Sequence, residues 1–243
     1  MTLFPSLIES ILGESIIGRA RKDGYIDLCC YNIRDYSADK HRKTDDTPFG
    51  GGMGMLMTCQ PIFDCYEAVK KSIPEGKKTK LIYMSPKGRI FNHSVARELS
   101  EYDELVFLCG YYEGVDERVI DALVDDEISI GDYVVTGGEL PACIVIDATA
   151  RLIDGVLAAP ECYLDESVAS GILEHPQYTK PRDFRGMTVP EVLLSGDHKK
   201  IAEWRLSEAV RITRERRPDL LLNHPEIEEA LMPRKKKKRK KED

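Results

Sequence analysis

Three glycine-rich strings are the residues of this sequence whose types and spacing best suit the binding of a ligand. They occupy residues 47–55, 110–118 and 131–141. Glycine has no Cβ, so it accepts positive φ angles and lets a ligand approach the backbone closely. A flexible loop would explain one such string. Three strings that converge on one sheet edge indicate a small-molecule cleft lined by backbone, although their spacing does not name the ligand.

Familiar signatures of nucleotide-binding and hydrolytic enzymes are absent from the sequence. There is no GxxxxGK[ST] loop, and glycines 50–54 neither follow a predicted strand nor fit the GxGxxG register. GxSxG and HExxH are missing as well. The cleft is therefore not expected to be a P-loop, a Rossmann dinucleotide site or a Rossmann methyltransferase site.

Cysteine and histidine, the usual ligands of a structural metal ion, are scattered along the chain. None of the seven cysteines forms a CxxC pair, and the five histidines show no metal-ligand spacing. A structural zinc ion needs four clustered nitrogen or sulfur ligands, so we expect no metal-binding residues. The odd number of cysteines, several of them inside apolar segments, indicates free thiols in the core of a cytoplasmic protein.

The composition excludes several classes of protein. Hydrophobic residues make up 42% of the 243 residues and charged residues 32%, which is typical of globular proteins. No apolar run approaches the roughly 20 residues of a membrane span. The first residues include Glu9 and Glu14 and lack an early cation, unlike a secretory signal. We therefore expect neither a membrane protein nor a disordered or collagen-like chain.

Charge is distributed very unevenly along the chain. The net charge is −7, yet residues 234–241 are eight consecutive cations. Such a tail is either a solvated, disordered extension or an arm that binds an anionic polymer by releasing its counterions. Because the rest of the chain is acidic, any affinity for nucleic acid must come from local patches.

Strand patterns and helix patterns alternate along the chain around the glycine-rich strings. Strands are predicted at residues 80–84, 104–109 and 127–130, with the first one stopping at 85–88. Helices are predicted at 94–99, capped by Ser94, at 117–124, and from Pro141 to about 157. This alternation favours an α/β domain with a mostly parallel sheet, whose ligands bind at the carboxyl ends of the strands.

After Leu157 the periodicity weakens. We interpret residues 158–170 as a linker and residues 171–233 as helical. Ile201, Trp204, Ala209 and Ile212 form a stripe that favours a core. Five arginines of the same helix are either a phosphate-binding surface or a solvated face: Arg205, Arg211, Arg214, Arg216 and Arg217.

Several long strings resemble one family of enzymes. They are residues 46–55 (DTPFGGGMGM), 110–118 (GYYEGVDER), 129–141 (SIGDYVVTGGELP), 175–181 (HPQYTKP) and 193–198 (LLSGDH), with Trp204-Arg205. From about residue 2 to 231, the chain resembles the bacterial tRNA (guanine-N1)-methyltransferases of the TrmD family, SPOUT superfamily, which modify the guanine 3′ of the anticodon.

The resemblance implies a fold and a set of partners. It implies a knotted SPOUT-type α/β domain with a parallel sheet over residues 1–157, the flexible linker 158–170 and a small all-helical tRNA-binding domain over 171–233, and it leaves the basic disordered tail 234–243 outside the match. It also implies a cytoplasmic homodimer that acts on tRNA, with S-adenosylmethionine as methyl donor and a dependence on Mg²⁺. No contact with a membrane is expected.

Site residues follow from the same resemblance, position by position. The residues expected at S-adenosylmethionine are Tyr83, Met84, Ser85, Pro86, Gly88, Gly110, Tyr112, Ile130, Gly131, Asp132, Tyr133, Val134, Val135, Gly137, Gly138 and Pro141. Glu113 and Arg151 match residues near the reacting base and methyl group. The residues expected to contact tRNA are Gly51, Gly52, Gly54, His175, Tyr178, Ser195 and Arg205.

The general base is expected in the linker, where the family has an aspartate before a Ser-Phe pair. Here residues 165–168 read Asp-Glu-Ser-Val, so alignment favours Glu166, and Asp165 is the alternative. Without the resemblance, both would be read as solvated linker acids.

Three further departures from the family concern other parts of the chain. The basic tail is an addition. Lys180 replaces an arginine, which removes a bidentate phosphate contact. The chain also begins a few residues later than the family does, which alters the edge of the sheet or the choice of start codon.

Two other functions remain open at this point. A related SPOUT enzyme could methylate ribose or ribosomal RNA with the same cofactor site. A non-catalytic RNA-binding protein could use the tail and the helical domain alone. Binding of S-adenosylmethionine separates the binding protein from both enzymes.

Overall fold

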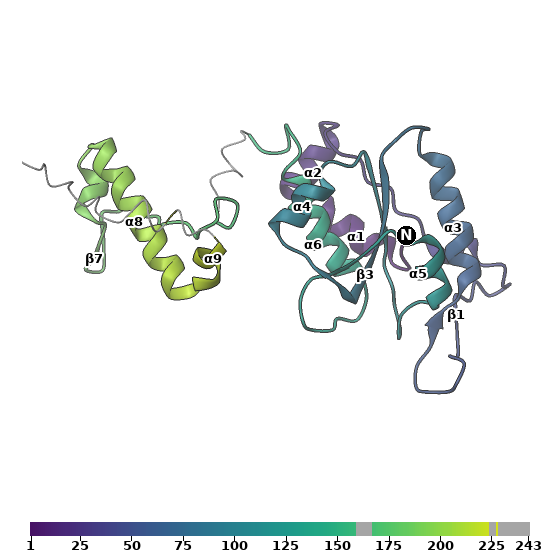
Figure 1. Cartoon of the computed structure of the whole chain (residues 1–243). Coiled ribbons are helices and arrows are strands. Elements are labelled where there is room, and N and C mark those ends of the chain that lie inside the picture. The colour runs from purple at the N-terminus through teal and green to yellow at the C-terminus, as the bar shows by residue number, and fades with distance from the viewer. Residues whose placement is uncertain (159–166, 224–226, 228–243) are drawn as a thin grey trace, which may run out of the picture. The chain divides into compact units, whose positions relative to one another are not determined.

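A computed structural model describes residues 1–158, 167–223 and 227 of the chain (Figure 1). Its contacts divide the chain into two compact units, Met1–Pro160 and Glu161–Asp243, called here the first and the second unit. In the described residues, no helix is both long and apolar enough to cross a membrane.

The first unit is built on a parallel sheet of three strands, as the sequence predicts. β3 (Thr79–Ile90) lies between β4 (Glu104–Leu108) and β5 (Asp126–Ser129). Tyr83 is opposite Leu108 on one side, and Met84 is opposite Ile128 on the other. The helices α4 (His93–Leu99) and α5 (Glu117–Leu123) make the two crossovers between the strands.

Helices cover both faces of the sheet (Figure 1). One core contains Ile82 of β3 with side chains of α1 (Pro5–Leu12), α2 (Ser15–Lys22), α4 and α6 (Glu139–Ala150). The other contains Leu81 with side chains of α3 (Cys59–Ser72), α5 and the short 3₁₀ helix η1 (Ile33–Tyr36). Leu81 and Ile82 face opposite cores because successive side chains of a strand alternate.

Strand β3 is longer than expected. Met84 and Arg89 are both opposite Ile128, so the intervening residues 85–88 form a bulge and the strand resumes up to Ile90. Pro86 and Gly88, which suggested a stop, are residues that strands accommodate at bulges. The expected end of the strand is therefore wrong, but the chain does leave the regular ladder at this point.

Two helix boundaries also differ from expectation. The side chain of Asn92, and not that of Ser94, accepts the capping hydrogen bond from the Val95 amide at 3.0 Å. Helix α6 ends at Ala150 instead of continuing to about 157. Gly155, with φ at +89°, lies in the turns that follow.

The second unit is mostly helical. It contains η2 (Glu191–Leu194), α8 (His198–Arg216) and α9 (Pro218–Asn223). Its small core includes Ile172, Ala209, Val210 and Leu221, whereas Trp204 is only half-buried. A short hairpin of β6 (Asp183–Phe184) and β7 (Met187–Thr188) was not predicted. Arg185 and Gly186 make its turn with φ angles of +57° and +82°, the signs that a tight hairpin turn requires.

The described cysteines are free thiols. Cys65, Cys109 and Cys143 are buried, as expected, whereas Cys29 is exposed. Burial raises the pKa of Cys65 to about 11, which keeps its thiol protonated at neutral pH.

Candidate functional site: a pocket at the carboxyl edge of the sheet

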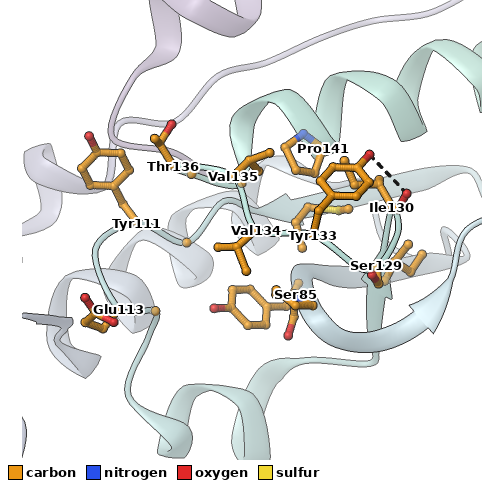
Figure 2. A pocket seen from close by; sticks show the side chains of 18 of the residues that line it. Ser85, Tyr111, Glu113, Ser129, Ile130, Tyr133, Val134, Val135, Thr136 and Pro141 are labelled. Atoms are coloured by element: carbon orange, nitrogen blue, oxygen red, sulfur yellow. Dashed lines mark hydrogen bonds between the residues drawn. The ribbon is translucent and has the colours of Figure 1, made fainter. Parts of the chain in front are cut away.

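A pocket opens where the three strands of the first unit end (Figure 2). Its walls come from β3 at the start of its bulge, from the residues after β4, and from the end of β5 with the segment that joins it to α6. The predicted cofactor residues that line it are Tyr83, Met84, Ser85, Pro86, Gly110, Tyr112, Ile130, Gly131, Tyr133, Val134, Val135, Gly137, Gly138 and Pro141. Parallel strands end at the same sheet edge, so segments far apart in sequence meet there.

The pocket has an apolar, open wall and a floor of packed backbone. Tyr133, Val134 and Val135 are exposed side chains of the segment after β5. In Figure 2, Tyr133 and Val134 lie over Ser85, while Glu113 and Tyr111 stand at another side of the pocket. Such a mixture of apolar side chains and exposed backbone suits a nucleoside-like ligand with a flat ring and polar edges.

The glycines of the pocket have a further role that their positions in the sequence do not reveal. A Cβ at Gly138 would lie 2.8 Å from the Cα of Cys109 and 3.0 Å from the amide nitrogen of Gly110. The Gly138 amide donates to the Gly110 carbonyl at 2.8 Å. Gly138 therefore allows two walls of the pocket to contact each other through their backbones.

At position 131 the backbone conformation itself requires glycine. Its φ of +143° is strained for any side chain, and a Cβ would lie 2.7 Å from the ring of Tyr133. The hydroxyl of Tyr133 donates to the Ile130 carbonyl at 3.4 Å, which holds the ring against this turn (Figure 2).

Gly88 and Asp132 are the two predicted cofactor residues that do not line this pocket. Gly88 packs against β5, where an added Cβ would lie 2.3 Å from the carbonyl carbon of Glu127. Asp132 is exposed. Gly88 thus closes the bulge of β3 onto the neighbouring strand.

The first glycine string reaches the pocket at Glu113. It forms the loop between β1 (Asp45–Asp46) and β2 (Leu56–Met57). A Cβ at Gly54 would lie 2.4 Å from the side chain of Glu113, and the Glu113 amide donates to the Met55 carbonyl at 3.0 Å. Gly51 and Gly52 are exposed and outside the pocket lining, so only Gly54 is brought beside Glu113.

Arg151 is not brought to this pocket within one chain. It is the C-cap of α6, whereas Gly138, at the pocket, is the N-cap of the same helix. The twelve helical residues between them span ~18 Å at the usual 1.5 Å rise. A role of Arg151 at the reacting base would therefore need a second copy of the chain.

The predicted tRNA contacts of the second unit gather partly around Trp204. The ring centroids of His175 and Tyr178 lie 6.3 and 6.5 Å from that of Trp204. Arg205 follows Trp204 on α8 and is exposed. The hydroxyl of Ser195 is hydrogen-bonded within the turn before α8, donating to the Val192 carbonyl at 2.7 Å.

The linker acids Asp165 and Glu166 lie outside the described residues. Within the described part of the chain, no group of three or more histidine, cysteine or acidic side chains is arranged to hold a metal ion.

Sequence reasoning missed some residues of the pocket. The lining residues it did not name are Tyr111, Gly114, Ile128, Ser129 and Thr136. All but Ile128 belong to strings already singled out, and Ile128 lies within the predicted third strand, 127–130. Proximity to the named glycines was therefore the available signal.

A charged network stands behind the pocket. Arg89 makes two hydrogen bonds to Glu98, at 2.7 and 2.8 Å, and also bonds Asp126, while Lys80 bonds both acids. Arg89 and Lys80 lie on either side of the bulge of β3, so the network ties both arms of the bulge to α4 and β5. Hydrogen bonds from Arg89 and Lys80 lower the pKa of Glu98 to about 2.

Comparisons with known proteins agree with this arrangement. A family model described as tRNA (Guanine-1)-methyltransferase TrmD matches residues 1–223. A tRNA (guanine-N(1)-)-methyltransferase of Ruminiclostridium cellulolyticum is 53% identical over 225 residues, covering 93% of this chain and 96% of the relative. That of Clostridioides difficile is 55% identical over 220 residues, covering 90% and 95%.

The match extends over both units and includes the strings that line the pocket. The parallel sheet with helices on both faces also agrees with the SPOUT-type fold expected from the resemblance. The chain belongs to the TrmD family of tRNA (guanine-N1)-methyltransferases.

Proposed function

We propose that the pocket of the first unit binds S-adenosylmethionine and that the chain transfers its methyl group to N1 of the guanine 3′ of the anticodon in tRNA. The observation that carries the proposal is the pocket itself. Two of the glycine strings shared with the family, together with the bulge of β3, converge there at the carboxyl edge of a parallel sheet.

The pocket residues have a positioning role in this reaction. The sulfonium of S-adenosylmethionine supplies an electrophilic methyl group, and guanine N1 must approach it in line. The Gly110 and Gly137–Gly138 backbone and the apolar wall would fix the donor for that approach. An anticodon-loop base is largely unpaired, so it can be turned into a pocket at low cost.

Guanine N1 carries a proton, so the reaction needs a base. Glu166 is our first choice and Asp165 the second, with Glu113 as the next candidate because it stands at the pocket. A carboxylate that accepts the proton during transfer contributes a rate factor of about 10²–10⁴.

An unpartnered apolar face supports the homodimer. Leu7 and Ile11 on α1 and Leu140 and Ile144 on α6 are large hydrophobic side chains exposed by 40–48%. Each pair is spaced by four residues, so each lies on one side of its helix, and the two helices pack together. In this proposal the second copy on this face is the source of the Arg151 that acts at the reacting base.

The remaining assignments belong to the same proposal. They are the knotted path, the division into residues 1–157, 158–170, 171–233 and 234–243, the cytoplasmic location, the Mg²⁺ dependence and the tRNA contacts of the second unit. The aromatic side chains near Arg205 support the tRNA contacts of the second unit. Tyr178 is exposed, and His175 and Trp204 are half-buried. Bases stack on aromatic rings, and phosphates attract cations such as Arg205.

Methyl transfer to unmodified tRNA transcripts tests the proposal directly. Incorporation of label from S-adenosylmethionine is expected, and it should disappear when the guanine after the anticodon is replaced. Label in ribose or in ribosomal RNA would favour the other SPOUT activities. Failure of S-adenosylmethionine to raise the melting temperature would favour a binding protein without catalysis.

The basic tail is tested separately, since it lies outside the described residues. Deleting residues 234–243 should weaken tRNA binding and flatten its dependence on salt, because fewer counterions are released. Affinity for S-adenosylmethionine and the methylated nucleotide should stay unchanged. An unchanged salt slope would show that the tail is a solvated extension.

A further inference from the structure

Two polar side chains from distant parts of the chain meet in the interior of the first unit. The Thr2 hydroxyl donates to Oε1 of Glu139 at 2.6 Å, across a separation of 137 residues. Thr2 is 0% exposed and Glu139 only 3%. Glutamate is rarely this buried unless its carboxylate is held by a partner, so the pair needs a reason.

The same N-terminal segment also bonds the end of β4. The Cys109 amide donates to the Met1 carbonyl at 3.0 Å, and the Met1 amino group donates to the Phe107 carbonyl at 2.9 Å. The Thr2 oxygen additionally accepts from the Phe4 amide at 2.9 Å, which fixes its orientation. Residues 1–4 are therefore attached both to the residue before Gly110 and to the first residue of α6 (Glu139).

Those two attachment points are where two walls of the pocket begin. Gly110 follows Cys109, and Gly137 and Gly138 precede Glu139. A Cβ at Gly137 would lie 2.5 Å from Oε2 of Glu139 and 2.9 Å from the ring of Tyr111. The carboxylate of Glu139 thus packs directly beneath the Gly137–Gly138 backbone, although neither Thr2 nor Glu139 lines the pocket.

The side chain of Glu139 is held at both carboxylate oxygens. The Thr2 hydroxyl donates to Oε1, and Oε2 lies 2.5 Å from where a Cβ at Gly137 would be. The hydrogen bond and the packing therefore fix one orientation of this side chain.

We propose that Glu139 is a positioning residue for S-adenosylmethionine binding, and that Thr2 holds it in place. The pair sets the distance between the Gly110 wall and the Gly137–Gly138 wall of the pocket without touching the ligand. This inference rests on the proposed function and concerns the same site.

Thr2→Val tests the proposal in the full-length protein, because valine keeps the shape of threonine and removes the hydroxyl. The buried Oε1 of Glu139 then lacks its donor, and the carboxylate and the wall above it shift. Calorimetry should show S-adenosylmethionine binding weakened about tenfold, the usual size of such a loss. Thr2→Ser restores the hydroxyl and should bind like the wild type.

A matched control separates positioning from loss of stability. Val69→Ala removes buried volume from α3, none of whose residues lines the pocket. It should lower the melting temperature and leave the affinity unchanged. Thr2→Val should instead lose affinity even at temperatures where circular dichroism shows it fully folded.

If Thr2→Val does not fold, a second variant, Glu139→Gln, tests the same proposal, because it keeps the size of the side chain. It removes the charge at the α6 N-terminus and should weaken binding several-fold. Wild-type affinity in a folded Thr2→Val or Glu139→Gln protein would overturn the inference. A wild-type protein that binds no S-adenosylmethionine would instead contradict the proposed function.

Discussion

The two units place their candidate functional residues by different physical means. In the first unit the pocket is shaped by backbone against backbone, as where Gly138 contacts Cys109 and Gly110. In the second unit the candidate residues Tyr178 and Arg205 are exposed, and the core beneath them is small. We therefore expect substitutions in the first unit to disrupt binding as a whole, and substitutions in the second to remove single contacts.

Gly138→Val should give the largest effect on ligand binding. Its Cβ alone meets the backbone at 2.8 Å, and the two γ-methyl groups add more, so α6 and the Gly110 wall must separate. Calorimetry should detect no binding of S-adenosylmethionine. The same contacts add a stability cost of about 1–3 kcal/mol for overpacking.

Gly76→Ala is the matched control for Gly138→Val. Gly76 has a φ of +83° and open space around its Cα, so a methyl group adds backbone strain without a clash. A loss of about 1–2 kcal/mol of stability is expected, with unchanged affinity. Tight ligand binding by Gly138→Val would contradict a pocket shaped by packed backbone.

Glu166→Gln tests whether a carboxylate of the linker is the general base of the reaction. The chemical step in single turnover should slow about 10²-fold or more if this carboxylate accepts the N1 proton. Binding of S-adenosylmethionine should be intact, and the wild-type rate should fall at low pH as the carboxylate protonates. A normal rate in Glu166→Gln with a slow Asp165→Asn would move the base by one residue. Normal rates in both would leave Glu113 as the candidate.

Substitutions in the second unit should have smaller and more local effects. Tyr178→Ala and Arg205→Ala should each weaken tRNA binding by about five- to tenfold, which corresponds to about 1–1.4 kcal/mol and lies at the lower end of the range for a stacked base. Arg211→Ala is the control, because Arg211 is already paired with Glu208 at 2.8 Å and with Glu215 at 2.9 Å. If all three variants bind tRNA equally well, this surface of the second unit does not contact the substrate.

The smallest expected effect concerns acid stability of the first unit. The pKa of Glu98 is lowered to about 2 in the fold, from an ordinary value of 4.5, chiefly by hydrogen bonds from Arg89. Between pH 4.5 and pH 2, Glu98 is protonated to a greater extent in the unfolded chain than in the folded one. The stabilisation of the fold by this carboxylate is therefore complete above about pH 4.5 and is lost as the pH falls toward 2.

Glu98→Gln should remove this part of the pH dependence. Acid unfolding followed by tyrosine fluorescence reports mainly on the first unit, which holds nine of the eleven tyrosines, whereas the single tryptophan, Trp204, belongs to the second. The slope of stability against pH between 4.5 and 2 should become shallower than in the wild type. An identical slope would mean that the network at the β3 bulge does not respond to protonation of Glu98.

Local patterns predicted the three strands of the parallel sheet, α4, α5, the start of α6 and most of the pocket, but they did not predict α1, α2, α3 or η1. Alternating apolar runs predicted the three parallel strands, and the known edge preference of such sheets placed the second and third glycine strings together. Local patterns failed at the β3 bulge, because a Pro-Lys-Gly sequence suits both a strand end and a bulge. The hairpin at Arg185 was missed because its strands are only two residues long.

By itself, then, the sequence determined the parallel sheet and the segments that contribute to the pocket, since these depend on residue types and short-range periodicity. The family followed from the resemblance of its long strings. Only the tertiary structure decided which segments touch. It put Gly54 against Glu113, Thr2 against Glu139, and Arg151 at the far end of α6. Contacts between residues as far apart as 137 positions depend on how helices pack across the sheet, and no local pattern records that packing.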